Sequence, residues 1–98
     1  MRLRAKIDAN QRAIVKALRQ CGVSVLSLAA LGRGVPDLLV YAPQLGYLLV
    51  EVKDGKKPPS ARRLTDDQQA WIDNWRGPVY KVESVAEALE LIGWQREP

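Results

Sequence analysis

The chain has 98 residues, 47% of them hydrophobic, and a formal net charge of +4. That length supports one compact domain over residues 1–98 and is too short for two. No apolar run approaches the roughly 18 residues of a membrane span, and the N-terminus lacks the apolar segment of a signal peptide. With no histidine and a single cysteine, the sequence excludes a zinc site built from those ligands and a Ser-His-Asp triad. We expect one intracellular domain without membrane contact.

The charge is unevenly distributed along the chain. Residues 1–63 contain 12 Lys and Arg against 4 acidic residues, whereas residues 64–98 contain 3 against 7. A positive excess of this kind indicates association with a polyanion such as nucleic acid and says nothing about the fold.

A helix is predicted first, over residues 9–21. Asp8 occupies the N-cap position, Gln11 follows three residues later as in a capping box, and Gly22 is placed to end the helix. The apolar-rich segment 23–31 (VSVLSLAAL) then predicts a strand, and the Gly-Arg-Gly after it predicts a turn.

The strongest strand patterns are those of residues 35–42 (VPDLLVYA) and 47–53 (YLLVEVK). The short PQLG segment that separates them predicts a tight antiparallel hairpin in which Ala42 pairs with Gly46. Both faces of each strand are largely apolar, which is typical of strands that are covered on both sides.

The rest of the chain predicts a loop, a helix, a strand and a last helix. Residues 54–63 (DGKKPPSARR) are rich in Gly, Pro and charge and predict the loop. Helical signals mark residues 66–76, with Thr65 as the N-cap. Residues 79–82 predict a strand parallel to its partner in the same sheet, and residues 84–93 a capped helix. This order predicts an α/β fold with a mixed central sheet.

Three charged residues interrupt the apolar hairpin. The predicted register sets Asp37 opposite Glu51, where like charges destabilise a sheet, and the period of two places Lys53 on the face of Glu51. Tyr47 and Leu49 belong to the same face and are expected in the core. Each charged residue alone is equally consistent with an exposed ion pair or a turn, but buried unpaired charge is costly. We therefore interpret the three as one site with a cation between the carboxylates.

Carboxylate oxygens are the ligands that Mg²⁺ and Mn²⁺ prefer, and such ions bind substrate phosphate through one or two carboxylates and retained waters. The ion would polarise a phosphate and activate a water, while Lys53 orients that water or neutralises charge in the transition state. The sequence therefore predicts a phosphodiester-cleaving site that needs Mg²⁺ or Mn²⁺ and no small-molecule cofactor.

The segments GVPDLLV and LLVEVKDGKKPPSARRLTDDQQAW together resemble the PD-(D/E)xK nuclease superfamily, and specifically its small stand-alone VRR-NUC proteins of phages and bacteria. The resemblance implies a restriction-endonuclease-like αβββαβ core with an extra C-terminal helix. The residues that it implies for catalysis are Asp37, Glu51, Lys53 and Gln68, and the metal ligands that it implies are Asp37, Glu51 and the backbone carbonyl of Val52.

Three of the candidate site residues have a second explanation. Many relatives carry a Glu on the first helix at the position of Gln11, and an amide is a poor metal ligand. Asp8, one turn earlier, is a substitute for that Glu, although both residues also fit a plain capping role. Gln68 likewise completes a capping box with Thr65.

The resemblance also implies a homodimer that acts on duplex or branched DNA, as Holliday-junction resolvases do, in the cytoplasm of a bacterium or a phage-infected host. Basic residues near the site either hold phosphates or keep the loop soluble: Arg33, Lys56, Lys57, Arg62 and Arg63. The pair Trp71 and Trp75, four residues apart on one helix, predicts core or dimer packing, and Trp94 a second interface contact.

The preferred hypothesis is a metal-dependent DNA endonuclease that selects its substrate by structure and not by sequence. The alternative is a catalytically inactive nucleic-acid-binding module of the same fold, which Gln11 favours. An RNA-binding sheet platform ranks third, because the chain has no Phe and no aromatic-rich strand.

Overall fold

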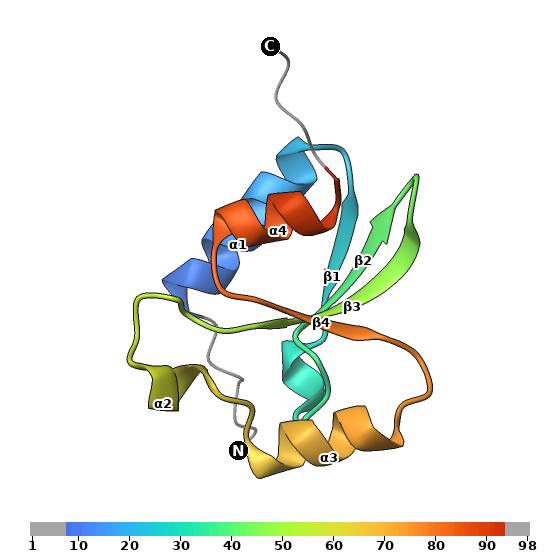
Figure 1. The fold of residues 1–98 in the computed structure, drawn as a ribbon. Coiled ribbons are helices and arrows are strands. Elements are labelled where there is room, and N and C mark those ends of the chain that lie inside the picture. The colour runs from blue at the N-terminus through green and yellow to red at the C-terminus, as the bar shows by residue number, and fades with distance from the viewer. Residues whose placement is uncertain (1–7, 94–98) are drawn as a thin grey trace.

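The computed structural model describes residues 8–93, so that Trp94 and its predicted interface contact lie outside the described residues. A four-stranded sheet carries helices on both of its sides (Figure 1). Its strands are β1 (Ser24–Ser27), β2 (Leu38–Ala42), β3 (Gly46–Val52) and β4 (Val79–Val82). The helices are α1 (Ala9–Gln20), α2 (Pro59–Arg62), α3 (Asp66–Asn74) and α4 (Val85–Leu91), with a 3-10 turn η1 (Ala29–Leu31). Within residues 8–93 no helix is long and apolar enough to cross a membrane.

The sheet has the order β1-β2-β3-β4 and mixed direction. Strands β1, β2 and β3 pair antiparallel in sequence, and β4 pairs parallel to β3, which confirms the predicted crossover. The hairpin has the predicted register: Ala42 pairs with Gly46, and the ladder ends where Leu38 pairs with Val50. Its next position sets Asp37 against Glu51.

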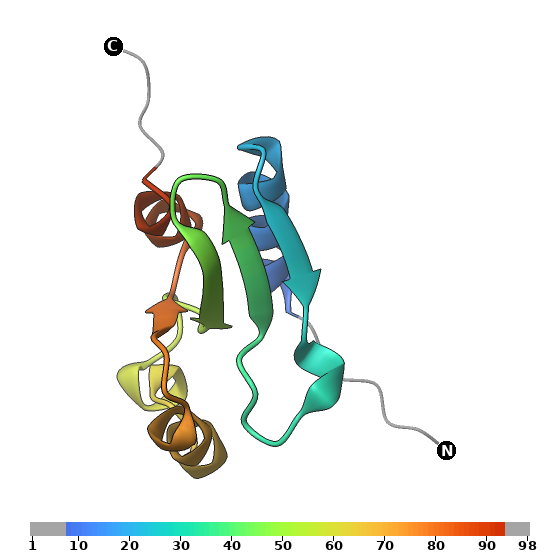
Figure 2. The same cartoon turned by 90° about the vertical axis from the view of Figure 1, so that its right-hand side faces the viewer.

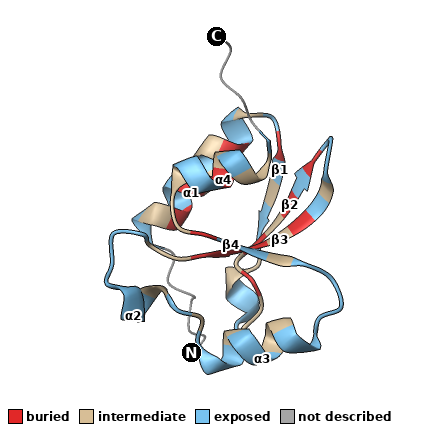
Figure 3. Cartoon of the chain, viewed as in Figure 1, coloured by how far each residue is buried: buried red, intermediate tan, exposed pale blue. Residues whose placement is uncertain are grey.

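The core lies between the sheet and the helices α1 and α4. These two helices lie side by side on one face of the sheet (Figure 1). Alternate strand residues point to them. The buried residues lie on the strands and on α1 and α4 (Figure 3). The buried apolar residues include Ile14 and Leu18 of α1, Leu38 and Val40 of β2, Leu48 and Val50 of β3, and Ala88 of α4.

The opposite face of the sheet is covered only in part. Helix α3 lies below the sheet in Figure 1, and the view in Figure 2 leaves the upper halves of β1 and β2 open. Tyr47 is 73% exposed and Leu26 58% exposed, so the expectation that Tyr47 lies in the core is wrong. The stacked Trp71 and Trp75 of α3 line an open pocket on this face together with Leu49 and Tyr47, and they leave most of Tyr47 exposed.

The predicted strands are shortened near the site. The strand expected over 23–31 ends at Ser27, where the chain turns into η1 and the Ser27 hydroxyl accepts the amide of Ala29 (3.4 Å). The strand expected over 35–42 begins at Leu38, because Pro36 has no N–H to donate to a ladder.

Two further boundaries differ from those expected. The segment 54–63 is not all loop, because Pro59 begins the one-turn helix α2 in the first helical position that proline favours. The helix expected over 66–76 ends at Asn74, since Trp75 already adopts an extended conformation ahead of Gly77 and Pro78.

Candidate active site

The three charged residues, Asp37, Glu51 and Lys53, lie close together at the C-terminal end of β3, which is a central strand of the sheet. One oxygen of the Asp37 carboxylate accepts the backbone N–H of Val52 (2.8 Å), which replaces a ladder bond at the point where β2 has not yet begun. On the other side, the backbone N–H of Lys53 donates to the carbonyl of Val82 (2.9 Å). The neighbours β2 and β4 therefore fix the backbone that carries Glu51.

Gln68 links the site to helix α3. Its side-chain oxygen accepts from the Lys53 ammonium (2.8 Å) and from the backbone N–H of Thr65 (2.8 Å), and its side-chain nitrogen donates to the Glu51 carboxylate (2.8 Å). The Thr65 hydroxyl accepts the backbone N–H of Gln68, which completes the capping box. The predicted capping box is therefore present, and the same amide group also contacts Glu51 and Lys53.

A close backbone contact seats α3 on the site. Gly34 has a φ of +82°, and a Cβ atom at this position would collide with the carbonyl group of Asp67 in the first turn of α3. Only glycine allows this approach at this backbone angle. The Gly-Arg-Gly turn thus sets the position of the helix turn that carries Gln68.

Glu51 is the most perturbed ionisable group of the site. It is only 2% exposed. Burial, the charge of Asp37 and a side-chain hydrogen bond with Asp37 raise the pKa of Glu51 from 4.5 to about 8, against the opposing effect of the Lys53 charge. Near neutral pH the Glu51 carboxyl therefore carries a proton, and a cation placed between the two acids would displace it.

The donor set fits a hard divalent ion. Among residues 8–93 there is no group of three or more His, Cys, Asp or Glu that could enclose a metal. Two carboxylates leave the remaining positions to waters, a backbone carbonyl and substrate phosphate, which is how proteins usually hold Mg²⁺. When bound, such an ion supplies Lewis-acid polarisation of the phosphate and a more acidic water.

Helix α1 approaches the site through a residue that sequence reasoning missed. The side-chain amide of Asn10 donates to the backbone carbonyl of Lys53 (2.8 Å), across 43 positions of sequence. Asp8 is exposed, and its carboxylate accepts the backbone N–H of Gln11 (2.8 Å), as expected of an N-cap. Gln11 is 6% exposed, on the α1 face that also buries Ile14.

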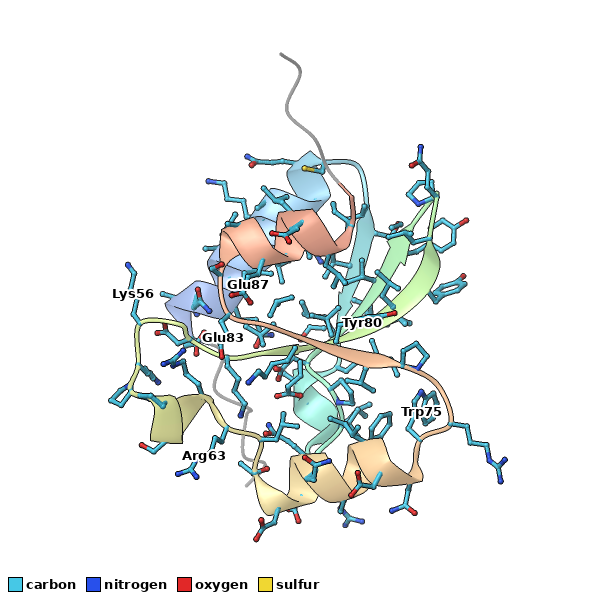
Figure 4. The ribbon with its side chains drawn as sticks, viewed as in Figure 1. Lys56, Arg63, Trp75, Tyr80, Glu83 and Glu87 are labelled. Carbon is cyan, nitrogen blue, oxygen red and sulfur yellow. The ribbon has the colours of Figure 1, made fainter. Side chains whose placement is uncertain are left out.

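The predicted DNA-binding residues fall into two groups. Lys56, Lys57, Arg63 and Arg33 are exposed, and Figure 4 shows Lys56 and Arg63 at the outer edge of the segment between β3 and α3. Arg62 is instead half-buried and pairs with Glu83 (3.2 Å), which lies further inward. Arg62 therefore links α2 to the residue that follows β4, and a phosphate at Arg62 would compete with this ion pair.

The family model for the VRR-NUC domain matches residues 4–86. The chain belongs to the VRR-NUC family. A solved structure titled "VRR_NUC domain" is similar to this VRR-NUC chain at 30% sequence identity, over 85% of this chain and 89% of that one, with a TM-score of 0.61. No curated protein matches the chain. These matches confirm the family and the restriction-endonuclease-like fold, and they make the chain a member of a nuclease family that is in general dependent on a divalent metal.

Proposed function

We propose that this VRR-NUC chain is a Mg²⁺- or Mn²⁺-dependent endonuclease that hydrolyses phosphodiester bonds in DNA. The observation that carries the proposal is the buried Glu51 carboxyl beside Asp37, with Gln68 joining Glu51 to the Lys53 ammonium. A structural ion pair does not need a buried acid beside a second carboxylate, because that arrangement costs free energy in the absence of a cation.

Each residue of the site has a distinct part in this proposal. Asp37 and Glu51, with the carbonyl of Val52, hold the ion. The Lys53 ammonium orients the attacking water or neutralises charge that develops on the phosphate. Gln68 is a positioning residue, because it sets both the carboxylate of Glu51 and the ammonium of Lys53.

Selection of branched or four-way DNA by a homodimer is the finer part of the proposal. A pair of sites at fixed separation would recognise the geometry of a junction without reading base sequence. The partly open sheet face, with exposed Leu26, Tyr41 and Tyr47, supports the proposal of a dimer because monomers seldom leave such apolar groups together in water. Sedimentation velocity of wild type and Tyr47→Lys tests it: a dimer that dissociates in the variant is expected, and a monomeric wild type contradicts it.

A cleavage panel tests the nuclease activity. Purified protein is incubated in Mn²⁺ with plasmid, flapped, splayed and four-way DNA, and Lys53→Ala and Glu51→Ala serve as controls. We expect cleavage of at least one substrate by wild type, none by Glu51→Ala, and strongly slowed cleavage by Lys53→Ala. Absence of cleavage of every substrate, or equal cleavage by Lys53→Ala, contradicts the proposal.

The alternative is a binding module that has the fold but not the activity. The buried Gln11 amide favours it, since this helix position offers no carboxylate. Calorimetry separates the two: DNA binding that weakens steeply with salt, without any Mn²⁺ binding, is the outcome that the binding module predicts.

A further inference from the structure

A second cationic feature, separate from Lys56 and Arg63, lies along helix α1. Helix α1 and strand β1 lie beside each other (Figure 2), and an open groove of about 600 Å³ is lined by residues of both. Arg12, Lys16 and Arg19 line it, and no carboxylate does.

The near end of this groove reaches the active site. Ser27, which lines it, pairs with Leu38, and the next residue of the chain, Leu28, donates its N–H to the carbonyl of Asp37 (2.7 Å). Gln11, which also lines the groove, follows Asn10, whose amide binds the Lys53 carbonyl. The groove therefore begins within one residue of Asn10 on α1 and at the end of β1, and both places are hydrogen-bonded to the backbone of the site.

The charge pattern of α1 indicates more than a solvated helix face. The helix Ala9–Gln20 contains three cations and no acid, so that Lys16 has a like charge four residues before it and another three residues after it. Such like-charge pairs destabilise a helix, and an anion in the groove would relieve the repulsion. The Arg19 guanidinium is already fixed across the groove by its bond to the carbonyl of Val25 (2.9 Å).

We propose that the groove between α1 and β1 binds the phosphate backbone of DNA beside the scissile bond, an inference that rests on the nuclease function proposed above. Arg12 and Arg19 are separated by about 10 Å along the helix, a length over which one strand of a duplex presents about three phosphates. The exposed Lys56 and Arg63, in the segment between β3 and α3, hold further phosphates of the same backbone.

DNA binding without cleavage tests the groove directly. Fluorescence anisotropy of a labelled duplex in EDTA, over a range of salt, compares wild type, Lys16→Gln, Lys16→Gln/Arg19→Gln and Arg76→Gln. The last variant is the matched control, because Arg76 is exposed in the turn between α3 and β4 and does not line the groove. Thermal unfolding of each variant verifies that the fold is retained.

We expect the groove variants to lose about eightfold in affinity at 0.1 M salt, and about 0.9 in salt slope, for each phosphate contact removed. The Arg76→Gln control should bind as wild type does. Groove variants that bind like the control overturn the inference even if the protein cleaves DNA. If wild type cleaves no DNA but the groove variants bind DNA more weakly than wild type, the binding groove is supported and the nuclease function is refuted. Wild-type binding to phosphatidylserine vesicles and not to DNA also overturns the inference.

Discussion

Free of metal, the protein should become less stable as the pH rises from 5 to 8. The pKa of Glu51 is near its ordinary 4.5 in the unfolded chain and about 8 in the folded one. Between these values the folded state binds more protons than the unfolded state, so the free energy of unfolding decreases with pH. The stabilisation is fully present below pH 4.5 and is lost as the pH passes through about 8.

The size of this effect follows from the two pKa values. At 1.36 kcal/mol for each pKa unit, integration from pH 5 to pH 8 gives a loss on the order of 3 kcal/mol. Few other groups obscure it, because the chain has no histidine. A domain of this size has a total stability of roughly 5 to 15 kcal/mol, so the change is large enough to measure.

Urea unfolding in EDTA, at several pH values, measures the loss in wild type and in Glu51→Gln. The amide of Glu51→Gln keeps an acceptor for Gln68 but cannot ionise. The free energy of unfolding of this variant should therefore be nearly independent of pH and should exceed that of wild type at pH 8. Saturating Mn²⁺ should restore the stability that wild type loses at pH 8, and it should leave the stability of Glu51→Gln unchanged. A wild-type profile that is flat or rises with pH, or an equal decline in both proteins, refutes the account of Glu51.

Three further predictions concern the residues around Asp37 and Glu51. Lys53→Met should slow cleavage on the order of a hundredfold while Mn²⁺ binding persists, and loss of Mn²⁺ binding in calorimetry would contradict its assigned part. Gln68→Ala should slow cleavage by a similar factor. Thr65→Ala removes only the cap, so it should lower the free energy of unfolding in urea by about 1 kcal/mol and retain cleavage. Equal cleavage by the two variants would show that Gln68 has no part in the site. Gly34→Ala should lower the free energy of unfolding by about 3 kcal/mol and displace α3. Gly46 has the same φ of +82° but open space around it, so Gly46→Ala should be less destabilising. Equal losses of stability in the two variants would argue against the close contact.

The local sequence contained enough information to predict the hairpin register. A short turn between two strands fixes which residues face each other, and the period of two then fixes their faces. This is why Asp37 could be placed against Glu51 without a structure. The role of Gln68 was harder to predict, because one side-chain amide makes both kinds of contact. Its oxygen completes the capping box, and its nitrogen donates to Glu51.

Contacts between distant segments could not be predicted in the same way. Asn10 reaches the Lys53 carbonyl only because the fold brings α1 to the end of β3. Arg62 pairs with Glu83 because Pro59 starts a helical turn that presents it to β4, and a loop reading of the segment gave no hint of this. The exposure of Tyr47 depends on what covers the outer face of the sheet, which a strand pattern does not encode.

The central claim is that a divalent ion binds between Asp37 and Glu51 by displacing the proton of Glu51. Isothermal titration of Mn²⁺ at pH 7, in two buffers of different ionisation enthalpy, counts the protons released on binding. We predict the release of about one proton per ion by the wild type, because the pKa of Glu51 is about 8, and no such release by Glu51→Gln. Binding without proton release, or binding that Glu51→Gln leaves unchanged, would contradict the claim.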